Sequence, residues 1–242
     1  MTDPVLSLIM PVHNEGATLR TVLERLGAVD MPVPYELIVV DDGSTDGAVE
    51  AIERSWVPNA TSVRVVTARR NCGKGAALRK GFDLTRGRIV GVQDADLEYD
   101  PGQIPDLLTP ILGGEADVVF GSRQFGANAS YSFWYTMGNR FISLAASMLF
   151  DRITTDAYTC FKFMRREALE GLELTADGFE IEAELTGGLL AAGWRYREIP
   201  ITYVARSREQ GKKIRAEDGL RAIRTLLLVR LSHIVGSTRN AP

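Results

Sequence analysis

The N-terminal half of the chain alternates between short apolar runs and segments whose apolar residues recur at helical spacing. Four apolar runs predict buried strands, over residues 5–12, 36–40, 63–66 and 88–92. A predicted helix follows each run; after the first, apolar residues fall at i, i+3, i+4 and i+7 from Leu19 to Leu26. Near-continuous apolar strands joined by helices predict an α/β fold, with a mostly parallel central sheet flanked by helices on both faces.

Local signals predict where these elements begin and end. Asn14 suits the N-cap of the first helix, and residues 100–103 resemble a capping box with Pro at the first helical position. Val49, Ile52 and Trp56 suggest a helix after the second strand. Later patterns predict strands over 117–123, 161–164 and 195–201, the last at a sheet edge, and helices over 132–150, 180–190 and 217–235.

Polar clusters follow all four of the first predicted strands and precede the helices. These clusters are Asn14/Glu15, Asp41/Asp42, Asn71/Gly73/Lys74 and Asp94/Asp96. In a parallel sheet the carboxyl ends of the strands share one edge, where open α/β folds bind ligands. We therefore expect the four clusters to converge on one site.

The most acidic of these clusters is Gln93-Asp94-Ala95-Asp96-Leu97-Glu98. Like charges this close repel, and one carboxyl group would raise its pKa unless a cation lies among them. Hard oxygen ligands suit Mg²⁺ or Mn²⁺, and Mg²⁺ usually takes one or two carboxylates plus substrate phosphates. A solvated acidic turn is the alternative for an isolated Asp-x-Asp. The expected convergence favours a metal–diphosphate site at Asp94, Asp96 and Glu98.

Composition narrows the class of protein. The chain has 242 residues, 45% of them hydrophobic, and two cysteines far apart in the sequence, so neither a disulfide framework nor a cysteine metal site is expected. No segment reaches the ~18 consecutive apolar residues of a membrane span. The N-terminus lacks a signal-peptide pattern. We therefore expect a cytoplasmic protein.

Charge is unevenly distributed. From Arg195 onward the chain has eleven Lys/Arg and four Asp/Glu, although its formal net charge is −3. A basic end on an acidic body suggests an anionic partner there. The basic residues do not form a long run, so we do not expect a nucleic-acid partner.

The predicted C-terminal helix follows the main domain. We expect one domain over residues 1–215, and an amphipathic helix with a tail over 216–242. Its apolar stripe is predicted to consist of Leu220, Ile223, Leu227, Leu231 and Ile234. This stripe can pack against the domain or lie on a membrane surface, and the sequence leaves both open.

Common nucleotide motifs do not match. Position 68 is Ala and position 75 is Gly, so Gly73-Lys74 does not complete a phosphate loop. The dinucleotide fingerprint is also missing after the first strand. Lys74, at the start of a helix, can still contact a phosphate, or it can be a solvated lysine.

The combined motifs resemble family 2 glycosyltransferases of the GT-A fold, over roughly residues 5–220. The N-terminal motifs are Val39-Val40-Asp41-Asp42-Gly43-Ser44-Thr45-Asp46, Asn71-x-Gly73-Lys74-Gly75 and Asp94-Ala95-Asp96. The C-terminal motifs resemble polyprenyl-phosphate sugar transferases, with the dolichyl-phosphate mannose synthase group nearest; they include Gly121-Ser122-Arg123, Thr159-Cys160-Phe161-Lys162, Phe179-Glu180-x-Glu182 and Arg206-x-x-x-x-Gly211-Lys212-Lys213.

The resemblance implies roles for individual residues. Residues implied to bind the nucleotide part of the donor are Pro11, Asn14, Glu15, Asp42, Asn71 and Lys74. Asp94, Asp96 and Glu98 would hold Mg²⁺ or Mn²⁺ and the diphosphate. Arg123, Arg206 and Lys213 would face donor diphosphate or acceptor phosphate, and Asp96, Arg123, Glu182, Arg206 and Lys213 form the implied catalytic set.

The resemblance implies inversion at the anomeric carbon. We therefore expect an inverting transferase that moves a hexose from GDP-mannose or UDP-glucose to a polyprenyl phosphate at the inner face of the membrane. A phosphate nucleophile is already anionic and needs little general base. A saccharide hydroxyl acceptor is the alternative, and would need a carboxylate base, for which Glu182 or Asp156 is the candidate. A third hypothesis is a nucleotide-sugar-binding regulator without turnover. The sequence does not determine the oligomeric state.

Overall fold

The computed structural model describes residues 3–124, 128–129, 133–206 and 216–239. Its main sheet has seven strands in the order β3-β2-β1-β4-β7-β5-β8. The strands are β1 (Leu6–Val12), β2 (Tyr35–Asp41), β3 (Ser62–Thr67), β4 (Ile89–Val92), β5 (Val118–Ser122), β7 (Lys162–Arg165) and β8 (Tyr196–Pro200). Only β7 runs antiparallel to its neighbours in this sheet, so the predicted α/β class and mostly parallel sheet are confirmed.

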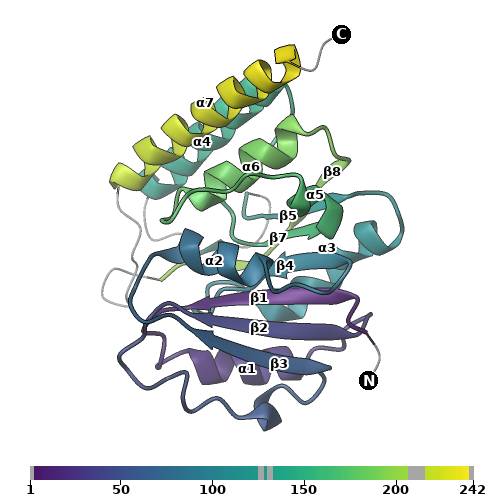
Figure 1. Cartoon of the computed structure of the whole chain (residues 1–242), viewed down its shortest axis with the longest axis vertical. Coiled ribbons are helices and arrows are strands. Elements are labelled where there is room, and N and C mark those ends of the chain that lie inside the picture. Colours follow the sequence, from purple (N-terminus) through teal and green to yellow (C-terminus); the bar gives the residue numbers. More distant parts are fainter. Residues whose placement is uncertain (1–2, 125–127, 130–132, 207–215, 240–242) are drawn as a thin grey trace.

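Helices cover both faces of the sheet (Figure 1). They are α1 (Leu19–Gly27), α2 (Lys74–Phe82), α3 (Ile104–Leu112), α4 (Phe133–Phe150), α5 (Arg166–Glu170), α6 (Ile181–Ala191) and α7 (Ala216–Arg239). Alternate side chains of β1 enter two different cores: Leu8 and Met10 pack with α1 and α3, whereas Ile9 packs with α2 and α6. This alternation is the period of two that a strand buried on both faces requires.

Two predicted helix starts need correction. Asn14 does not cap α1, which begins at Leu19 after Thr18. Instead, Asn14 has a positive φ of 54°, and its side-chain oxygen accepts a hydrogen bond from the backbone N–H of Thr45 at 2.8 Å. Asp100 does accept from the N–H of Gly102, but it caps the short 3-10 helix Pro101–Gln103 that precedes α3.

The helix suggested by Val49, Ile52 and Trp56 is absent from the described part of the chain. The segment forms turns and a single 3-10 helix, Arg54–Trp56. The backbone N–H groups of Ile52 and Trp56 bond to carbonyls three residues earlier. Val49, Ile52 and Trp56 still pack against the same core, as they would from an α-helix. The spacing of these apolar residues therefore fits both successive turns and an α-helix.

The helix α7 packs on the domain through Ala222 and Leu226 and leaves most of the predicted apolar stripe exposed. Ala222 and Leu226 are fully buried in a third core with α4 and α6, and Figure 1 shows α4 and α7 side by side at one end of the molecule. Of the predicted stripe, Ile223 is partly buried, whereas Leu220, Leu227, Leu231 and Ile234 are exposed. Among the described residues, no helix is long and apolar enough to cross a membrane.

A glycine brings two site loops into contact. Gly43 follows Asp42 at the end of β2 and has a φ of +69°. A Cβ there would lie 2.6 Å from the carbonyl carbon of Arg70 and 2.8 Å from the nitrogen of Asn71. The absence of a side chain therefore lets the loop after β3 lie directly against the end of β2.

We predict that Gly43→Ala destabilises the protein more than Gly47→Ala. Gly47 also has a positive φ, of +72°, but a Cβ there meets nothing within 4 Å. The left-handed conformation alone costs an alanine about 1–2 kcal/mol, and Gly43→Ala adds the backbone clash. Urea unfolding of both variants measures the difference; equal losses would show that the close approach of the two loops does not matter.

Candidate active site

The strand-end clusters converge on one cavity at the carboxyl edge of the parallel strands. Its walls come from the ends of β1, β2 and β4, the loop after β3 and the start of α2, with additions from later segments. The lining residues are Pro11, Val12, His13, Glu15, Asp42, Asn71, Gly73, Lys74, Ala77, Asp94, Ala95, Asp96, Glu98, Cys160, Phe179 and Arg206. The geometric expectation that these segments meet is therefore confirmed.

Asp42 holds the loop after β3 in place. Its two carboxylate oxygens accept hydrogen bonds from the backbone N–H groups of Cys72 at 2.7 Å and Gly73 at 2.8 Å. Its backbone oxygen lies 2.9 Å from Nδ1 of His13, at the end of β1. Asp42 thus joins three strand ends, and this fixes the position of Asn71 and Lys74 beside it.

Asn14 lies outside the set of residues that line the cavity. Its backbone N–H donates to the hydroxyl of Ser44, and its side chain accepts from Thr45. These bonds orient the turn after β2. Pro11, Glu15 and Asn71 line the cavity itself.

Lys74 and Asp94 belong to a buried chain of alternating charges. Lys74 Nζ lies 2.9 Å from Asp94 and 3.1 Å from Glu182, and Glu182 is paired at 2.6 Å with the fully buried Lys162. Burial alone would lower the pKa of Lys74, but Asp94, Cys160 and Glu182 outweigh it and raise that pKa well above its usual value. Burial likewise opposes ionisation of Glu182, yet Lys162 and Lys74 hold its pKa below the ordinary value. Lys74 and Glu182 are therefore held in their charged forms.

Arg206 is the cation nearest to the second aspartate. Its Nη2 lies 2.6 Å from Asp96 Oδ2 and its Nη1 lies 3.0 Å from Glu15 Oε2. Its backbone N–H donates to Glu98 Oε1 at 2.7 Å, and the hydroxyl of Tyr203 donates to Glu98 Oε2. Glu98 therefore fixes the main chain of the Arg206 segment next to Asp96.

The carboxylates at the end of β4 remain short of positive charge. Burial, Asp94 and Glu98 together raise the pKa of Asp96 to about 7, although Arg206 opposes them. In the described part of the chain, no three or more His, Cys, Asp or Glu side chains form a ready-made metal site, since Lys74 and Arg206 already face Asp94 and Asp96. The unbalanced negative charge and the oxygen donors nevertheless fit a hard divalent cation that would also bind a diphosphate.

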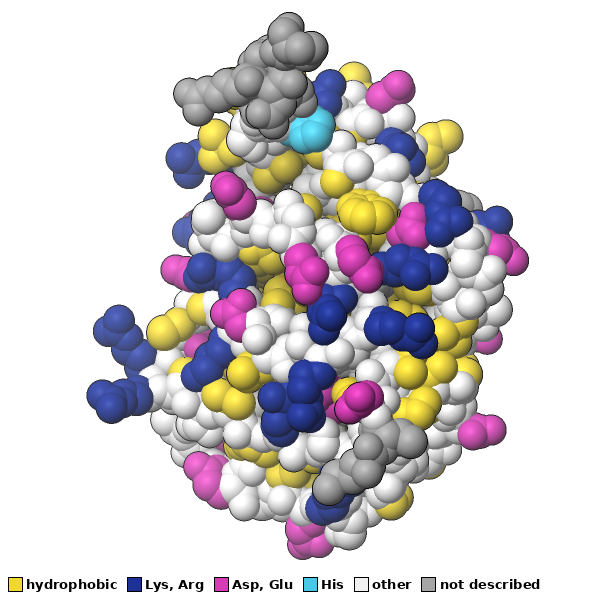
Figure 2. All heavy atoms as spheres, turned by 45° about the vertical axis from the view of Figure 1, so that its right-hand side comes forward, with side chains coloured by type: hydrophobic (Ala, Val, Ile, Leu, Met, Phe, Trp, Pro, Cys, Tyr) yellow, Lys and Arg dark blue, Asp and Glu magenta, His cyan; other side chains and the backbone are white. Residues whose placement is uncertain are grey.

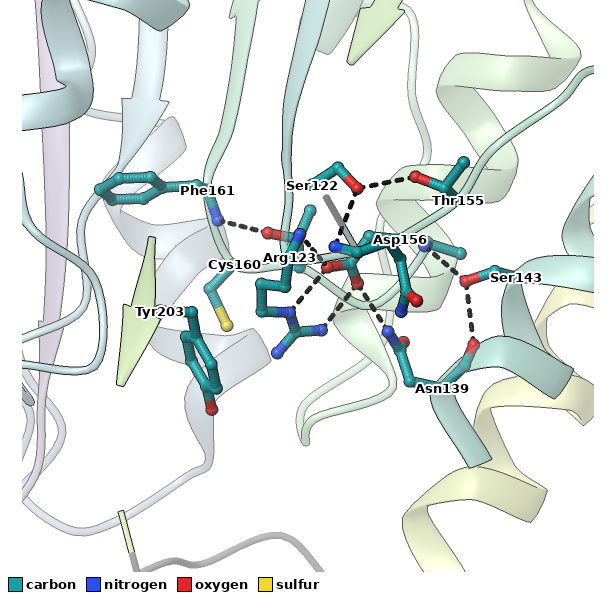
Figure 3. A network of polar contacts seen from close by, with 12 residues as sticks. Ser122, Arg123, Asn139, Ser143, Thr155, Asp156, Cys160, Phe161 and Tyr203 are labelled. Carbon is teal, nitrogen blue, oxygen red and sulfur yellow. Dashed lines mark hydrogen bonds and ion pairs between the residues drawn. The ribbon is translucent and has the colours of Figure 1, made fainter. Parts of the chain in front are cut away.

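Arg123 lies at the end of β5 in a rigid polar network (Figure 3). The side chain of Asp156, fully buried, accepts hydrogen bonds from Nε, Nη2 and the backbone N–H of Arg123, and from Asn139 of α4. Burial opposes ionisation of Asp156, but Arg123 and Asn139 hold its pKa below the usual value. The guanidinium carbon lies 5.0 Å from the ring centre of Tyr203, which links Arg123 to Glu98 and hence to the cavity.

Sequence reasoning missed several neighbours of the site. Tyr203 contacts both Arg123 and Glu98, and Phe179 lines the cavity. Lys162 forms a buried ion pair with Glu182. Lys162 and Phe179 lie within motifs that carried the resemblance, which was the available signal. Lys213, part of the predicted catalytic set, lies outside the described residues.

Comparison with known proteins agrees with this geometry. The family model for glycosyl transferase family 2 matches residues 7–172. A dodecaprenyl-phosphate galacturonate synthase of Rhizobium johnstonii is 30% identical over 214 residues, which is 84% of this chain and 61% of that protein. A dolichol-phosphate mannosyltransferase of Pyrococcus furiosus is 28% identical over 85% of this chain and 58% of its own. The chain spans about three fifths of the length of these relatives.

Solved structures give the same fold. Glucosyl-3-phosphoglycerate synthase of Mycobacterium tuberculosis, in a complex with Mn²⁺ and UDP-glucose, aligns with a TM-score of 0.68 at 23% identity, covering 95% of this chain and 79% of that one. At that identity the likeness shows the fold alone. The matched family model covers more than half of the chain and includes the strand ends that build the cavity. The chain therefore belongs to glycosyl transferase family 2.

Proposed function

We propose that this protein transfers a hexose from a nucleoside-diphosphate sugar, GDP-mannose or UDP-glucose, to a polyprenyl phosphate, with inversion and with Mg²⁺ or Mn²⁺. Two of its relatives carry names that include a polyprenyl or dolichol phosphate. The observation that supports a phosphate acceptor most directly is that Asp156 and Glu182 are buried and paired with cations. Neither carboxylate considered as a base for a hydroxyl acceptor is available for proton transfer.

Asp156 has both oxygens engaged by Arg123 and Asn139, and Glu182 lies between two lysines at 2.6 and 3.1 Å. Both side chains are buried, and both have pKa values held below the ordinary range. A general base needs an accessible lone pair and a pKa near the working pH. A phosphate acceptor avoids this requirement because its oxygen is already anionic at neutral pH.

The cations of three ion pairs suit the binding of two anions; the pairs are Lys74–Asp94, Arg123–Asp156 and Arg206–Asp96. Lys74 would hold the donor diphosphate beside Asp94, and Arg123 and Arg206 would bring in the acceptor phosphate, since a guanidinium can contact a phosphate through two hydrogen bonds. Asp94, Asp96 and Glu98 would hold the divalent cation, which neutralises charge on the leaving diphosphate when bound. Asp42 and Asn71 would keep the nucleotide side of the cavity in shape.

We predict that Asp96→Asn lowers the rate of lipid-linked sugar formation by roughly 10²–10³-fold, the usual cost of removing one group that stabilises transition-state charge. The assay follows radiolabelled hexose from GDP-mannose or UDP-glucose into an organic phase with polyprenyl phosphate and Mn²⁺. Asp106→Asn, at an exposed site on α3, is the matched control and should leave the rate unchanged.

The same assay separates the alternatives. Label that enters saccharide and stays in the aqueous phase would favour a hydroxyl acceptor, and tight donor binding without turnover would favour a regulator. Full activity of Asp96→Asn, with Asp106→Asn also active, would contradict the role proposed for the acidic cluster.

We predict that Asp156→Asn destabilises the protein by about 3–5 kcal/mol at pH 7, because it leaves the Arg123 charge buried and unpaired. A lowered pKa means that Asp156 stabilises the fold fully above about pH 4, near the pKa of an unfolded aspartate, and loses this effect as the pH falls further. The difference from the wild type should therefore shrink on acidification. Urea unfolding between pH 3 and pH 7 measures it.

Turnover by Asp156→Asn provides a second measurement. A positioning role through Arg123 predicts a raised KM for the lipid phosphate with a smaller change in kcat. A variant that loses kcat alone, with unchanged stability, would indicate that Asp156 acts as a base instead.

We further propose peripheral contact with the inner face of the membrane through α4 and α7. Exposed apolar side chains gather on both helices: Phe133, Trp134, Met137, Phe141, Leu144 and Met148 on α4, and Leu220, Leu227, Leu228, Leu231, Ile234 and Val235 on α7. Arg140, Arg221 and Arg224 are nearby cations in the sequence of these helices. An apolar face with basic flanks is typical of helices that lie at a lipid interface.

The face of the molecule in Figure 2 has a different character, since its Lys and Arg side chains are interspersed with Asp and Glu. Such mixing is typical of a solvated surface and differs from the basic stripe of a nucleic-acid-binding face.

We predict that the double variant Met148→Glu/Leu231→Glu reduces co-flotation with anionic vesicles by at least about tenfold, because each exposed aliphatic side chain contributes roughly 1.5–3 kcal/mol when it leaves water. Val65→Glu/Leu112→Glu is the control, because these residues are also exposed apolar side chains but lie on β3 and α3. Equal loss in both double variants would contradict a specific α4/α7 surface.

A further inference from the structure

Arg206 lies among three carboxylates from two loops: Glu15 follows β1, and Asp96 and Glu98 follow β4. Its Nη1 contacts Glu15 at 3.0 Å, its Nη2 contacts Asp96 at 2.6 Å, and its Nε lies 3.8 Å from Glu98. The side chain is only 17% exposed. A single guanidinium thus faces Glu15, Asp96 and Glu98, whereas Lys74 faces Asp94 of the same acidic turn.

Two observations indicate that this arrangement is not the final bound state. Three carboxylates, Glu15, Asp96 and Glu98, face the one guanidinium of Arg206 and outnumber it. In addition, the Nε–H of Arg206 is buried and has no hydrogen-bond partner among the described residues. A buried donor without an acceptor is costly, and it suits an anionic oxygen that arrives later.

The main chain at Arg206 is held independently of its side chain. The backbone N–H donates to Glu98, and Tyr203, three residues earlier, donates to the same carboxylate. The guanidinium can therefore leave Asp96 and Glu15 while the backbone stays anchored beside the cavity.

We propose that Arg206 is the protein's own counter-ion at the position of the divalent cation, and that it leaves Asp96 when that cation binds and turns to the acceptor phosphate. This inference rests on the function proposed above. Arg206 and a divalent cation repel each other and compete for the same Asp96 oxygens, so both cannot keep full contact. The order of events follows: cation and donor bind first, and their binding makes the Arg206 guanidinium available to the phosphate.

Binding of Mn²⁺, measured without substrate at pH 8 from the electron paramagnetic resonance signal of the unbound ion, tests the competition. We expect Arg206→Gln to bind Mn²⁺ about tenfold more tightly than the wild type, a typical size for coupling between two ligands. Arg206→Lys keeps the charge and should stay closer to the wild type. Arg195→Gln removes a guanidinium paired with Asp117. These two residues come just before β8 and β5 and do not line the cavity, so this variant should match the wild type.

Equal or weaker Mn²⁺ binding by Arg206→Gln would overturn the proposal. If Arg206→Gln folds only when Mn²⁺ is present, the result supports the proposal, because the ion then supplies the missing positive charge. A variant that stays unfolded at saturating Mn²⁺ would overturn it.

The second half of the proposal is tested with farnesyl phosphate in detergent. In the wild type, Mn²⁺ with UDP should tighten binding of this lipid phosphate, and by linkage the lipid should tighten Mn²⁺ binding by the same factor. Arg206→Gln should lose this coupling. Wild-type affinity for farnesyl phosphate that is unchanged by Mn²⁺–UDP would overturn the exchange. Because these are binding measurements, they remain informative if the transferase assay finds no lipid-linked product.

Discussion

The requirement to neutralise buried carboxylates at one edge of the sheet organises the molecule. Glu15, Asp94, Asp96 and Glu98 are each at most 9% exposed, and they reach the edge from β1 and β4. Their cations come from elsewhere in the chain, Lys74 from the start of α2 and Arg206 from beyond β9 (Tyr203–Val204). Removing one partner of a buried pair leaves an uncompensated charge. The loops are therefore held together by electrostatics as well as by the cores beneath them.

The same principle extends below and beside the cavity. Glu182, which pairs with Lys74, also forms an ion pair with Lys162. Asp156 forms an ion pair with Arg123 at the end of β5. Tyr203 touches both sides, through its ring to Arg123 and through its hydroxyl to Glu98. Asp96, Glu98, Arg206, Tyr203 and Arg123 are thus parts of one connected network. Glu98 and Tyr203 lie between Asp96 and Arg123 in this network, since the Glu98 N–H donates to Asp96 and the Tyr203 hydroxyl donates to Glu98.

The sequence predicted the strands and their shared edge because apolar runs and helical spacing are local properties. It did not predict that β7 lies antiparallel between β4 and β5, since strand order depends on packing between distant segments. Nor did it predict which cation faces which carboxylate; Arg206 is 110 residues from Asp96. The turns after β2 have the apolar spacing of a helix. Because α7 has apolar residues on more than one face, periodicity alone did not determine which face is buried.

An acceptor that brings its own negative charge suits this network better than one that must lose a proton. Asp156 and Glu182 are held in their charged forms by cations in contact with them, and a carboxylate stabilised in this way is a weak base. By contrast, Arg123 and Arg206 keep their positive charge at every physiological pH. A site whose arginines keep their charge, and whose Asp156 and Glu182 stay paired with cations, suits two phosphate groups without either of these two carboxylates changing its protonation state.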